Sequence, residues 1–156
     1  MVIRKLRKED DLADLVILSR SFFEEYAAFH TEFFSIGVLR DEDIISYFRG
    51  SVDSDDGVTF IAEEGGLIVG YITVFLHNQE PFWAVKKVGA ISGLMVHKDY
   101  RRRGIASGLF AEAKAFFEQR GVKYFTVYTA SANEAAIALY ERFGMSQLHT
   151  TLIGEI

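Results

Sequence analysis

Two apolar, β-rich runs separated by a short turn constrain the fold of this chain most strongly. Residues 58–62 and 67–76 are rich in Val, Ile, Phe and Thr, and residues 63–66 between them read Glu-Glu-Gly-Gly. Glycine adopts positive φ without steric cost, so this spacing is typical of a β-hairpin. Residues 89–96 form a third run of the same character, which predicts another strand in the same sheet.

Helical periodicity occupies the chain on both sides of these strands. After the acidic Asp10 and Asp11, apolar residues recur at about 3.6-residue spacing up to Tyr26, which predicts a first helix. A shorter helix is expected to follow Asp41 and to end near Gly50. The strongest apolar stripe belongs to a helix that begins at residue 105 and ends before residue 121: Ile105, Leu109, Ala113, Phe116 and Phe117.

The last third of the chain predicts a strand, a helix and two more strands. Residues 124–129 alternate aromatic, β-branched and polar side chains, which favours a strand. Ser131 and Glu134 have the spacing of a capping box, and Gly144 suits the end of the helix that would follow. Residues 145–149 and 151–156 are expected to form two short closing strands.

The predicted element order is β-α-α-β-β-β-α-β-α-β-β, beginning with a short strand around Val2, Ile3 and Leu6. Such an order is typical of an α/β fold built around a mixed sheet. The sequence contains no internal repeat, low-complexity tract or linker. We therefore expect residues 1–156 to form a single domain.

Composition excludes several kinds of chemistry. The chain has no cysteine, which excludes disulfides, thiolate metal sites and a cysteine nucleophile, and its four histidines show no metal-ligand spacing, so no metal is expected. A net charge of −5 argues against nucleic-acid binding and tolerates a cationic substrate. No apolar run is long enough to span a membrane and no signal peptide is evident, so a cytoplasmic location is expected.

Three consecutive arginines stand directly before the strongest helix, where cations oppose the helix dipole. The unpaired N–H groups of the first helical turn favour an anion there, and Gly104 permits close approach of a ligand. Arginine side chains also contact phosphate through charge-assisted hydrogen bonds. From the residues alone, a phosphate site and a solvated basic turn both stay open, and neither a P-loop nor a dinucleotide-binding fingerprint is present.

The hexapeptide RRRGIA at residues 101–106 matches the [RQ]-x-x-G-x-[GA] signature of the GNAT N-acetyltransferase superfamily. The preceding LMVHKDYR and the later LYERFGM also resemble that superfamily, and the element order agrees over essentially the whole chain. The resemblance implies a mostly antiparallel sheet flanked by helices and an N-acetyltransferase that uses acetyl-coenzyme A. A direct attack by the acceptor amine in a ternary complex needs no covalent enzyme intermediate.

The resemblance also implies where coenzyme A binds. The pyrophosphate would lie on the backbone amides of residues 102–106, supplemented by the arginine side chains and a serine hydroxyl, and the pantetheine arm would pair with a strand. The residues implied are Leu94, Met95, Val96, Arg101, Arg102, Arg103, Gly104, Ile105, Ala106, Ser107 and Asn133.

Tyr140 is the candidate general acid. Asn133, Ile137 and Tyr140 fall at i, i+4 and i+7 and share one helix face, and seven residues rise about 10.5 Å, which would let Asn133 contact pantetheine while Tyr140 reaches the sulfur. A tyrosine pKa near 10 against a thiol pKa near 8.5 is a mismatch that the surroundings can narrow. The alternative interpretation is that Tyr140 is simply a core aromatic residue.

The general base is where this chain departs from the family pattern. Many members carry a glutamate on the strand before the signature, but Ser92 stands at that place here. Three alternatives remain open: a base from elsewhere, a chain of water molecules, or an acceptor that arrives partly deprotonated.

The acceptor is expected to contact the first two helices and the loop around residues 80–83. Candidate acceptor-binding residues are Glu25, His30 and Phe34, whose acidic and aromatic character suits a cationic or aromatic primary amine, either a small molecule or a peptide amine. The alternative is that these acids are merely solvated and these aromatics belong to the core.

Two other functions compete with acetyl transfer. A non-catalytic acyl-coenzyme A sensor would keep the cofactor site and lose the base, as Ser92 suggests. A nucleic-acid-binding module would use the arginines, which the net charge opposes. A homodimer is also possible, since late strands of this superfamily often pair across dimers.

Overall fold

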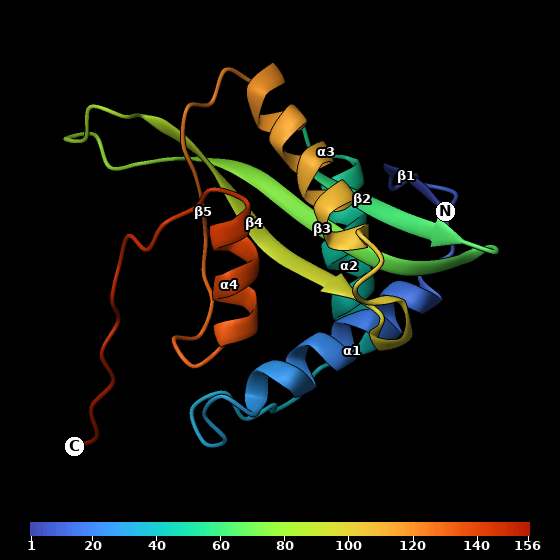
Figure 1. Cartoon of the computed structure of the whole chain (residues 1–156), viewed down its shortest axis with the longest axis horizontal. Coiled ribbons are helices and arrows are strands. Elements are labelled where there is room, and N and C mark those ends of the chain that lie inside the picture. The colour runs from blue at the N-terminus through green and yellow to red at the C-terminus, as the bar shows by residue number, and fades with distance from the viewer.

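A twisted five-stranded sheet forms the centre of the computed structural model, which describes residues 1–156 (Figure 1). The strands lie in the order β1-β2-β3-β4-β5; the first four are antiparallel neighbours and β5 runs parallel to β4. Their bounds are β1 (Val2–Lys5), β2 (Gly57–Glu64), β3 (Leu67–Asn78), β4 (Lys87–Val96) and β5 (Phe125–Val127).

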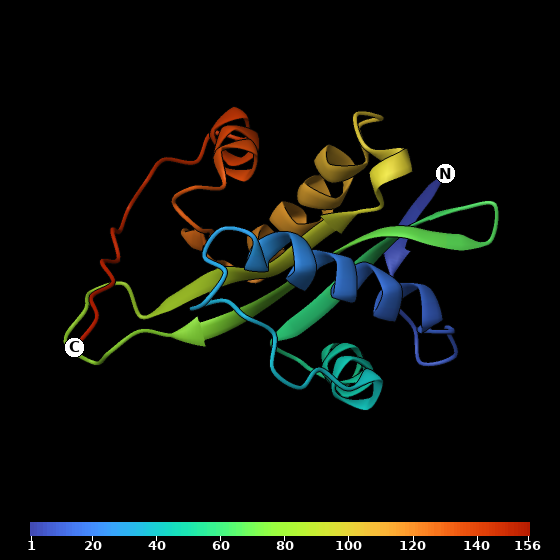
Figure 2. The same cartoon turned by 90° about the horizontal axis from the view of Figure 1, so that it is seen from below.

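Helices cover both faces of this sheet (Figure 2). One face carries α1 (Ala13–Ala27) and α2 (Asp41–Val52), and the other carries α3 (Ile105–Gln119) and α4 (Glu134–Arg142). A single 3-10 turn, η1 (Lys98–Tyr100), follows β4. The mixed, mostly antiparallel α/β fold that the sequence predicts is confirmed.

The β2–β3 hairpin forms where the sequence predicts it. Gly65 and Gly66 have φ of +63° and +83°, and Glu64 pairs with Leu67 across the turn. Because alternate strand residues face opposite sides, the two strands supply both cores. Phe60 and Ile72 contribute to the core under α3, while residues one position away contribute to the core under α1 and α2.

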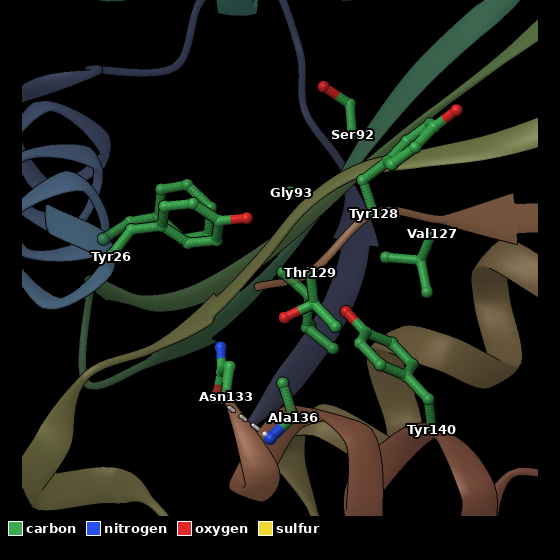
Figure 3. Close-up of a pocket in the computed structure, with 11 residues that line it drawn as sticks. Tyr26, Ser92, Gly93, Val127, Tyr128, Thr129, Asn133, Ala136 and Tyr140 are labelled. Carbon is green, nitrogen blue, oxygen red and sulfur yellow. Dashed lines mark hydrogen bonds between the residues drawn. The ribbon is translucent and has the colours of Figure 1, made fainter. Parts of the chain in front are cut away.

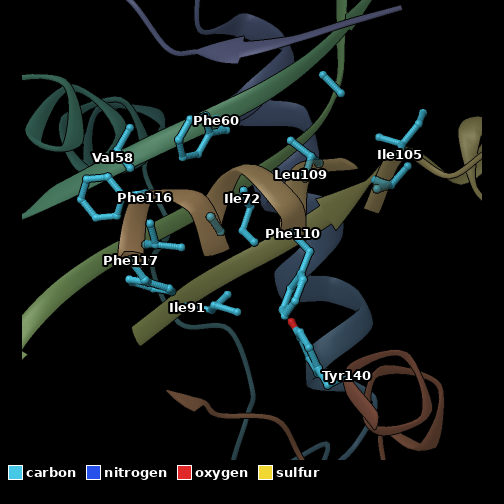
Figure 4. Packing of buried hydrophobic residues seen from close by; sticks show 14 of the residues in the cluster. Val58, Phe60, Ile72, Ile91, Ile105, Leu109, Phe110, Phe116, Phe117 and Tyr140 are labelled. Carbon is cyan, nitrogen blue, oxygen red and sulfur yellow. The ribbon is translucent and has the colours of Figure 1, made fainter. Parts of the chain in front are cut away.

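The predicted apolar stripe of α3 is entirely buried against the sheet (Figure 4). Leu109 and Phe117 are among the largest fully buried side chains of the molecule. Phe117 packs so closely on β4 that a Cβ at Gly89 would lie 2.4 Å from its ring. Real Cβ contacts are never that short, so this crossing of α3 over β4 requires glycine.

A β-bulge in β4 places Ser92 outside the regular ladder. Thr73 of β3 pairs with Gly93, but the next residue, Val74, pairs with Ile91, which leaves Ser92 as the extra residue. A bulge redirects a side chain and increases the local twist of the strand. The Ser92 hydroxyl contacts Tyr47 of α2 as a result.

The two closing strands that the sequence predicts over residues 145–149 and 151–156 are absent. The chain after α4 runs away from the sheet as an extended, exposed segment (Figure 1), and no backbone hydrogen bond lies beyond the Met145 N–H. A strand needs a neighbour to accept its hydrogen bonds, and this segment lies beside none. The strand expected over residues 124–129 is likewise shorter, because pairing with β4 ends at Val127.

Candidate functional site

A pocket opens where β4 and β5 separate (Figure 3). Their pairing ends at Ile91 and Val127, beside the bulge at Ser92, so no strand pairs with that edge of β4 farther along. The cavity measures about 70 Å³. Its walls come from α1, β4, β5 with the loop that follows it, and α4: Phe22, Tyr26, Ser92, Gly93, Leu94, Val127, Tyr128, Thr129, Asn133, Ala136 and Tyr140.

The residues that the sequence implied for the pantetheine arm lie along this open edge. Leu94 lines the pocket, whereas the side chains of Met95 and Val96 are buried in the cores on opposite faces of the sheet. Only the main chain of the last two can therefore face a ligand. An unpaired strand edge offers backbone donors and acceptors to an extended polar chain.

The basic turn leads from β4 into α3 and presents unpaired backbone donors. No protein acceptor binds the N–H groups of residues 102–107. Gly104 is the N-cap residue of α3, with φ of +79°, and Arg102 is the one non-glycine residue with positive φ, at +62°. A Cβ at Gly104 would meet nothing within 4 Å, so the space above it is open. Converging N–H groups at a helix start attract an anion.

Two of the three arginines are already paired with acids of this chain. Arg101 donates to Glu25 of α1 at 2.6 Å, and Arg103 donates to Glu64 of β2 at 2.7 Å. Arg102 has no acidic partner. These pairs show how an acidic protein holds a basic cluster at a helix start, although each exposed pair stabilises the fold by at most about 1 kcal/mol.

The first turn of α3 is fixed by packing on its other side. Ile105 is buried, whereas Ser107 is exposed and free to turn its hydroxyl toward a ligand. A Cβ at Gly108 would lie 2.4 Å from Ile3, so α3 begins in close contact with β1. The unpaired N–H groups therefore sit on a firmly docked helix.

Helix α4 positions Tyr140 at the end of the pocket. Its side chain is only 9% exposed, its hydroxyl points into the pocket (Figure 3), and no protein group hydrogen-bonds to it. Burial raises the pKa of Tyr140 to about 12. The gap to a thiol pKa near 8.5 is therefore wider than in water, so the surroundings seen in this structure do not narrow it.

The N-terminus of α4 differs from the sequence-based prediction. The N-cap is Asn133, whose Oδ1 accepts from the Ala136 N–H at 3.2 Å, and not Ser131. A turn in which the Asn133 N–H bonds to the Ala130 carbonyl delays the helix start by two residues. The capping box with Glu134 is thus absent. Asn133 still lines the pocket, with its Oδ1 engaged and its amide nitrogen free.

The three candidate acceptor-binding residues do not line the pocket. Glu25 pairs with Arg101, and His30 is exposed with its Nδ1 accepting from the Phe33 N–H at 3.1 Å. Phe34 packs edge-on against Tyr26, with ring centroids 4.9 Å apart. Phe34 therefore supports the wall of the pocket from behind.

Tyr47 is a site residue that the sequence-based reasoning missed. Its hydroxyl lies 2.5 Å from Ser92 Oγ, at the position where the family pattern places a carboxylate. The two residues are 45 positions apart, so no local motif links them. Tyr47 stands next to the buried Phe48 on α2, so the sequence suggests only a packing residue there.

Neither a metal site nor a spanning helix is found. No group of three or more His, Cys, Asp and Glu side chains is arranged to hold a metal ion. None of the helices combines the length and apolar character needed to cross a bilayer.

Comparison with known sequences gives the family of this chain. The model of the "Acetyltransferase (GNAT) family" matches residues 15–145. An uncharacterized N-acetyltransferase from Archaeoglobus fulgidus is 29% identical over 140 residues, which cover 90% of this chain and 89% of the relative. One from Methanocaldococcus jannaschii is 26% identical over 148 residues, which cover 93% of this chain but only 60% of the relative.

Solved structures share the fold at low identity. A mutant of the Bacillus halodurans protein BH1408 superposes with a TM-score of 0.88 at 20% identity, covering 100% of this chain and 99% of that one. An aminoglycoside N-acetyltransferase in complex with coenzyme A gives 0.78 at 17% identity, covering 99% and 93%. Because one continuous family match spans the open β4 edge, the arginine turn and Tyr140, this chain belongs to the acetyltransferase (GNAT) family.

Proposed function

We propose that the protein is an N-acetyltransferase that moves the acetyl group of acetyl-coenzyme A to a primary amine by direct attack in a ternary complex. The observation that carries the proposal is the unpaired Tyr140 hydroxyl inside a pocket at the end of an open strand edge. The acceptor would be a small cationic or aromatic amine or a peptide amine. A single domain, a cytoplasmic location and a homodimer stay predictions.

The chain offers groups that fit each part of coenzyme A. The free N–H groups of residues 102–107 and the Arg102 side chain would bind the pyrophosphate. The main chain of residues 94–96 would bind the pantetheine amides, helped by the free amide nitrogen of Asn133. When bound, acetyl-coenzyme A supplies a thioester whose acetyl carbon is open to attack by an amine.

Tyr140 would act at the sulfur as a hydrogen-bond donor. Because burial raises its pKa to about 12, the phenol stays protonated at neutral pH and can stabilise the charge that develops as the C–S bond breaks. Complete proton transfer from Tyr140 to the thiolate would be uphill, so the donated hydrogen bond carries the effect.

The attacking amine would approach from the α2 side, past Ser92. Ser92 and Tyr47 are both hydroxyl residues, and neither is a base at neutral pH. A proton lost by the amine would therefore leave through these hydroxyls and water, since Tyr47 is 45% exposed. An amine that arrives neutral would need no base before the attack, and the proton that its nitrogen loses as the amide forms would pass through water to the departing thiolate.

Thiol release tests the proposal. The protein is incubated with acetyl-coenzyme A and a panel of primary amines, and free thiol is followed over time. Acetylation of at least one amine, lost in Tyr140→Phe but kept in the exposed-tyrosine control Tyr124→Phe, supports the proposal. Thiol release that is equal in the wild type and Tyr140→Phe, or coenzyme A binding without turnover, would instead favour an acyl-coenzyme A sensor, the reading that Ser92 motivates.

A further inference from the structure

A second cavity, of about 200 Å³, lies between α2 and the sheet. It is bounded by the end of α2 and its following loop, by β2 and β3, and by the bulge of β4: Tyr47, Gly50, Ser51, Ser54, Gly57, Thr73, Val74, Phe75 and Ser92. Ser92 is the residue that this cavity shares with the Tyr140 pocket. The two cavities are therefore neighbours on either side of this residue.

A row of hydroxyls beside this cavity has a fixed direction. The Ser51 hydroxyl donates to the Phe48 carbonyl at 2.7 Å. Each hydroxyl carries one proton, so in the contact of 2.7 Å between Ser51 and Thr59 the donor is Thr59. For the same reason, Thr73 donates in its contact of 2.8 Å with Thr59.

In this arrangement the Thr73 hydroxyl uses its proton in the hydrogen bond to Thr59, and no donor hydrogen-bonds to the lone pairs of Thr73 Oγ1. Thr73 is only 4% exposed and lines the cavity. A buried oxygen in this state accepts a hydrogen bond but cannot give one to a ligand. It therefore selects an N–H or O–H group and discriminates against an ether or carbonyl oxygen.

Thr73 also lies close to the bulge at Ser92. It pairs with Gly93 across the bulge, next to Ser92, and neighbouring strands are about 4.8 Å apart. A ligand whose amine lies at the bulge can therefore reach Thr73 with a polar group only a few bonds away from that amine. Phe75, which is 41% exposed, offers apolar surface for the ligand's carbon skeleton, and no charged side chain lines the cavity.

We propose that this cavity binds the acetyl acceptor and that Thr73 Oγ1 accepts a hydrogen bond from it. The acceptor class is then a primary amine with a hydroxyl or a second amino group on the neighbouring carbon, a vicinal amino alcohol or diamine. This inference rests on the proposed acetyltransferase function and specifies the substrate class of that site.

Three matched amines test this assignment: vicinal aminocyclohexanol, its O-methyl ether, and cyclohexylamine. On the neighbouring carbon they carry, in turn, a group that donates and accepts a hydrogen bond, a slightly larger group that only accepts, and no polar group. For each we measure kcat/KM by thiol release and, separately, binding to the coenzyme A complex by calorimetry. The wild type should favour the alcohol over the ether by about tenfold, the effect of one buried hydrogen bond.

Thr73→Val keeps the shape of the side chain and removes the acceptor oxygen. The preference for the alcohol over cyclohexylamine should vanish, and Thr73→Ser should restore it. Ser51→Ala gives a more specific readout. It frees the Thr59 proton, so the hydroxyl row can reverse and Thr73 can donate, which should raise binding of the ether relative to the alcohol.

The outcomes separate the two proposals. A wild-type protein with no preference for the alcohol, or a preference that survives in Thr73→Val, overturns the Thr73 assignment. If no amine is acetylated but the alcohol binds in a manner that depends on Thr73, the assignment stands and the acetyltransferase proposal fails. Unfolding temperatures and the exposed control Thr150→Val show whether a loss reflects folding alone.

Discussion

The two faces of the sheet offer different kinds of polar groups to a ligand. On the α3 side, the donors are backbone N–H groups of residues 102–107, held by a helix whose apolar stripe is fully buried. On the α2 side, the polar groups are side-chain hydroxyls, including Ser92, Thr73 and Tyr47. In the proposed function, the backbone set would bind a group common to many enzymes, whereas the hydroxyl set would vary with the acceptor.

Removal of the Tyr140 hydroxyl should have the largest effect. Tyr140→Phe is expected to lower kcat by about 100-fold or more, because the developing thiolate loses its hydrogen-bond donor. Coenzyme A affinity should hardly change, since the ring still packs in the core. Turnover assays and calorimetry measure the two effects. An equal loss of affinity and turnover would mean that Tyr140 only supports the pocket.

A carboxylate introduced at the arginine turn should weaken coenzyme A binding selectively. Gly104→Glu is expected to raise the Kd for coenzyme A at least about tenfold, through like-charge repulsion at the phosphate site and loss of the left-handed cap. Gly65→Glu is the matched control, because Gly65 also has positive φ and open space around it. Equal affinities of the two variants would contradict a phosphate site at residue 104.

Alanine substitutions at two glycines of β4 compare how tightly the two faces of the sheet are packed. Gly89→Ala should destabilise the fold by about 1–3 kcal/mol, because its Cβ would meet Phe117 at 2.4 Å. Gly93→Ala faces Tyr71 at 3.4 Å, an ordinary contact, and should cost less. Denaturant unfolding measures both. A larger loss for Gly93→Ala would show that the α1 and α2 side is the tighter core.

The arginines should differ according to their partners. Arg102→Ala should weaken coenzyme A binding more than Arg103→Ala, by less than about fivefold, because Arg103 is paired with Glu64 and Arg102 is free. Titrations at low and high salt check this, since the difference should shrink as salt screens the exposed charge. The reverse order would show that Arg103 exchanges Glu64 for phosphate.

The pH profile should show no contribution from Tyr140 in the ordinary range. Its raised pKa of about 12 keeps the phenol protonated, so kcat/KM should rise as the acceptor amine deprotonates and then level off. The raised pKa also contributes to the stability of the folded state. This contribution is fully present below the pKa of an unfolded tyrosine, near 10, and is lost as pH rises from there through about 12. A falling limb near pH 8–9 that disappears in Tyr140→Phe would contradict this.

Local features were predictable from the sequence because they depend on neighbouring residues. The hairpin at Gly65 and Gly66 and the stripe of α3 follow from backbone freedom and from side-chain periodicity. The arginine turn was recognised for the same reason. One local prediction was wrong: the chain turns once more before α4, so Asn133 replaces Ser131 as the cap.

Features that join distant segments required the tertiary structure. The closing strands were predicted from β-prone residues, but a strand forms only beside a partner, and β5 ends at Val127. The pairs Arg101–Glu25 and Tyr47–Ser92 join residues 76 and 45 positions apart. No spacing rule reveals such contacts.

The sequence by itself determined the family, the arginine turn and the identity of Tyr140 as a candidate, since these rest on short segments with fixed spacing. Only the tertiary structure decided that Tyr140 is buried with a raised pKa, that Ser92 occupies a bulge, and that Thr73 has a free acceptor oxygen. The reason is physical: burial, strand register and the direction of a hydroxyl row depend on which segments pack together, and packing is not local.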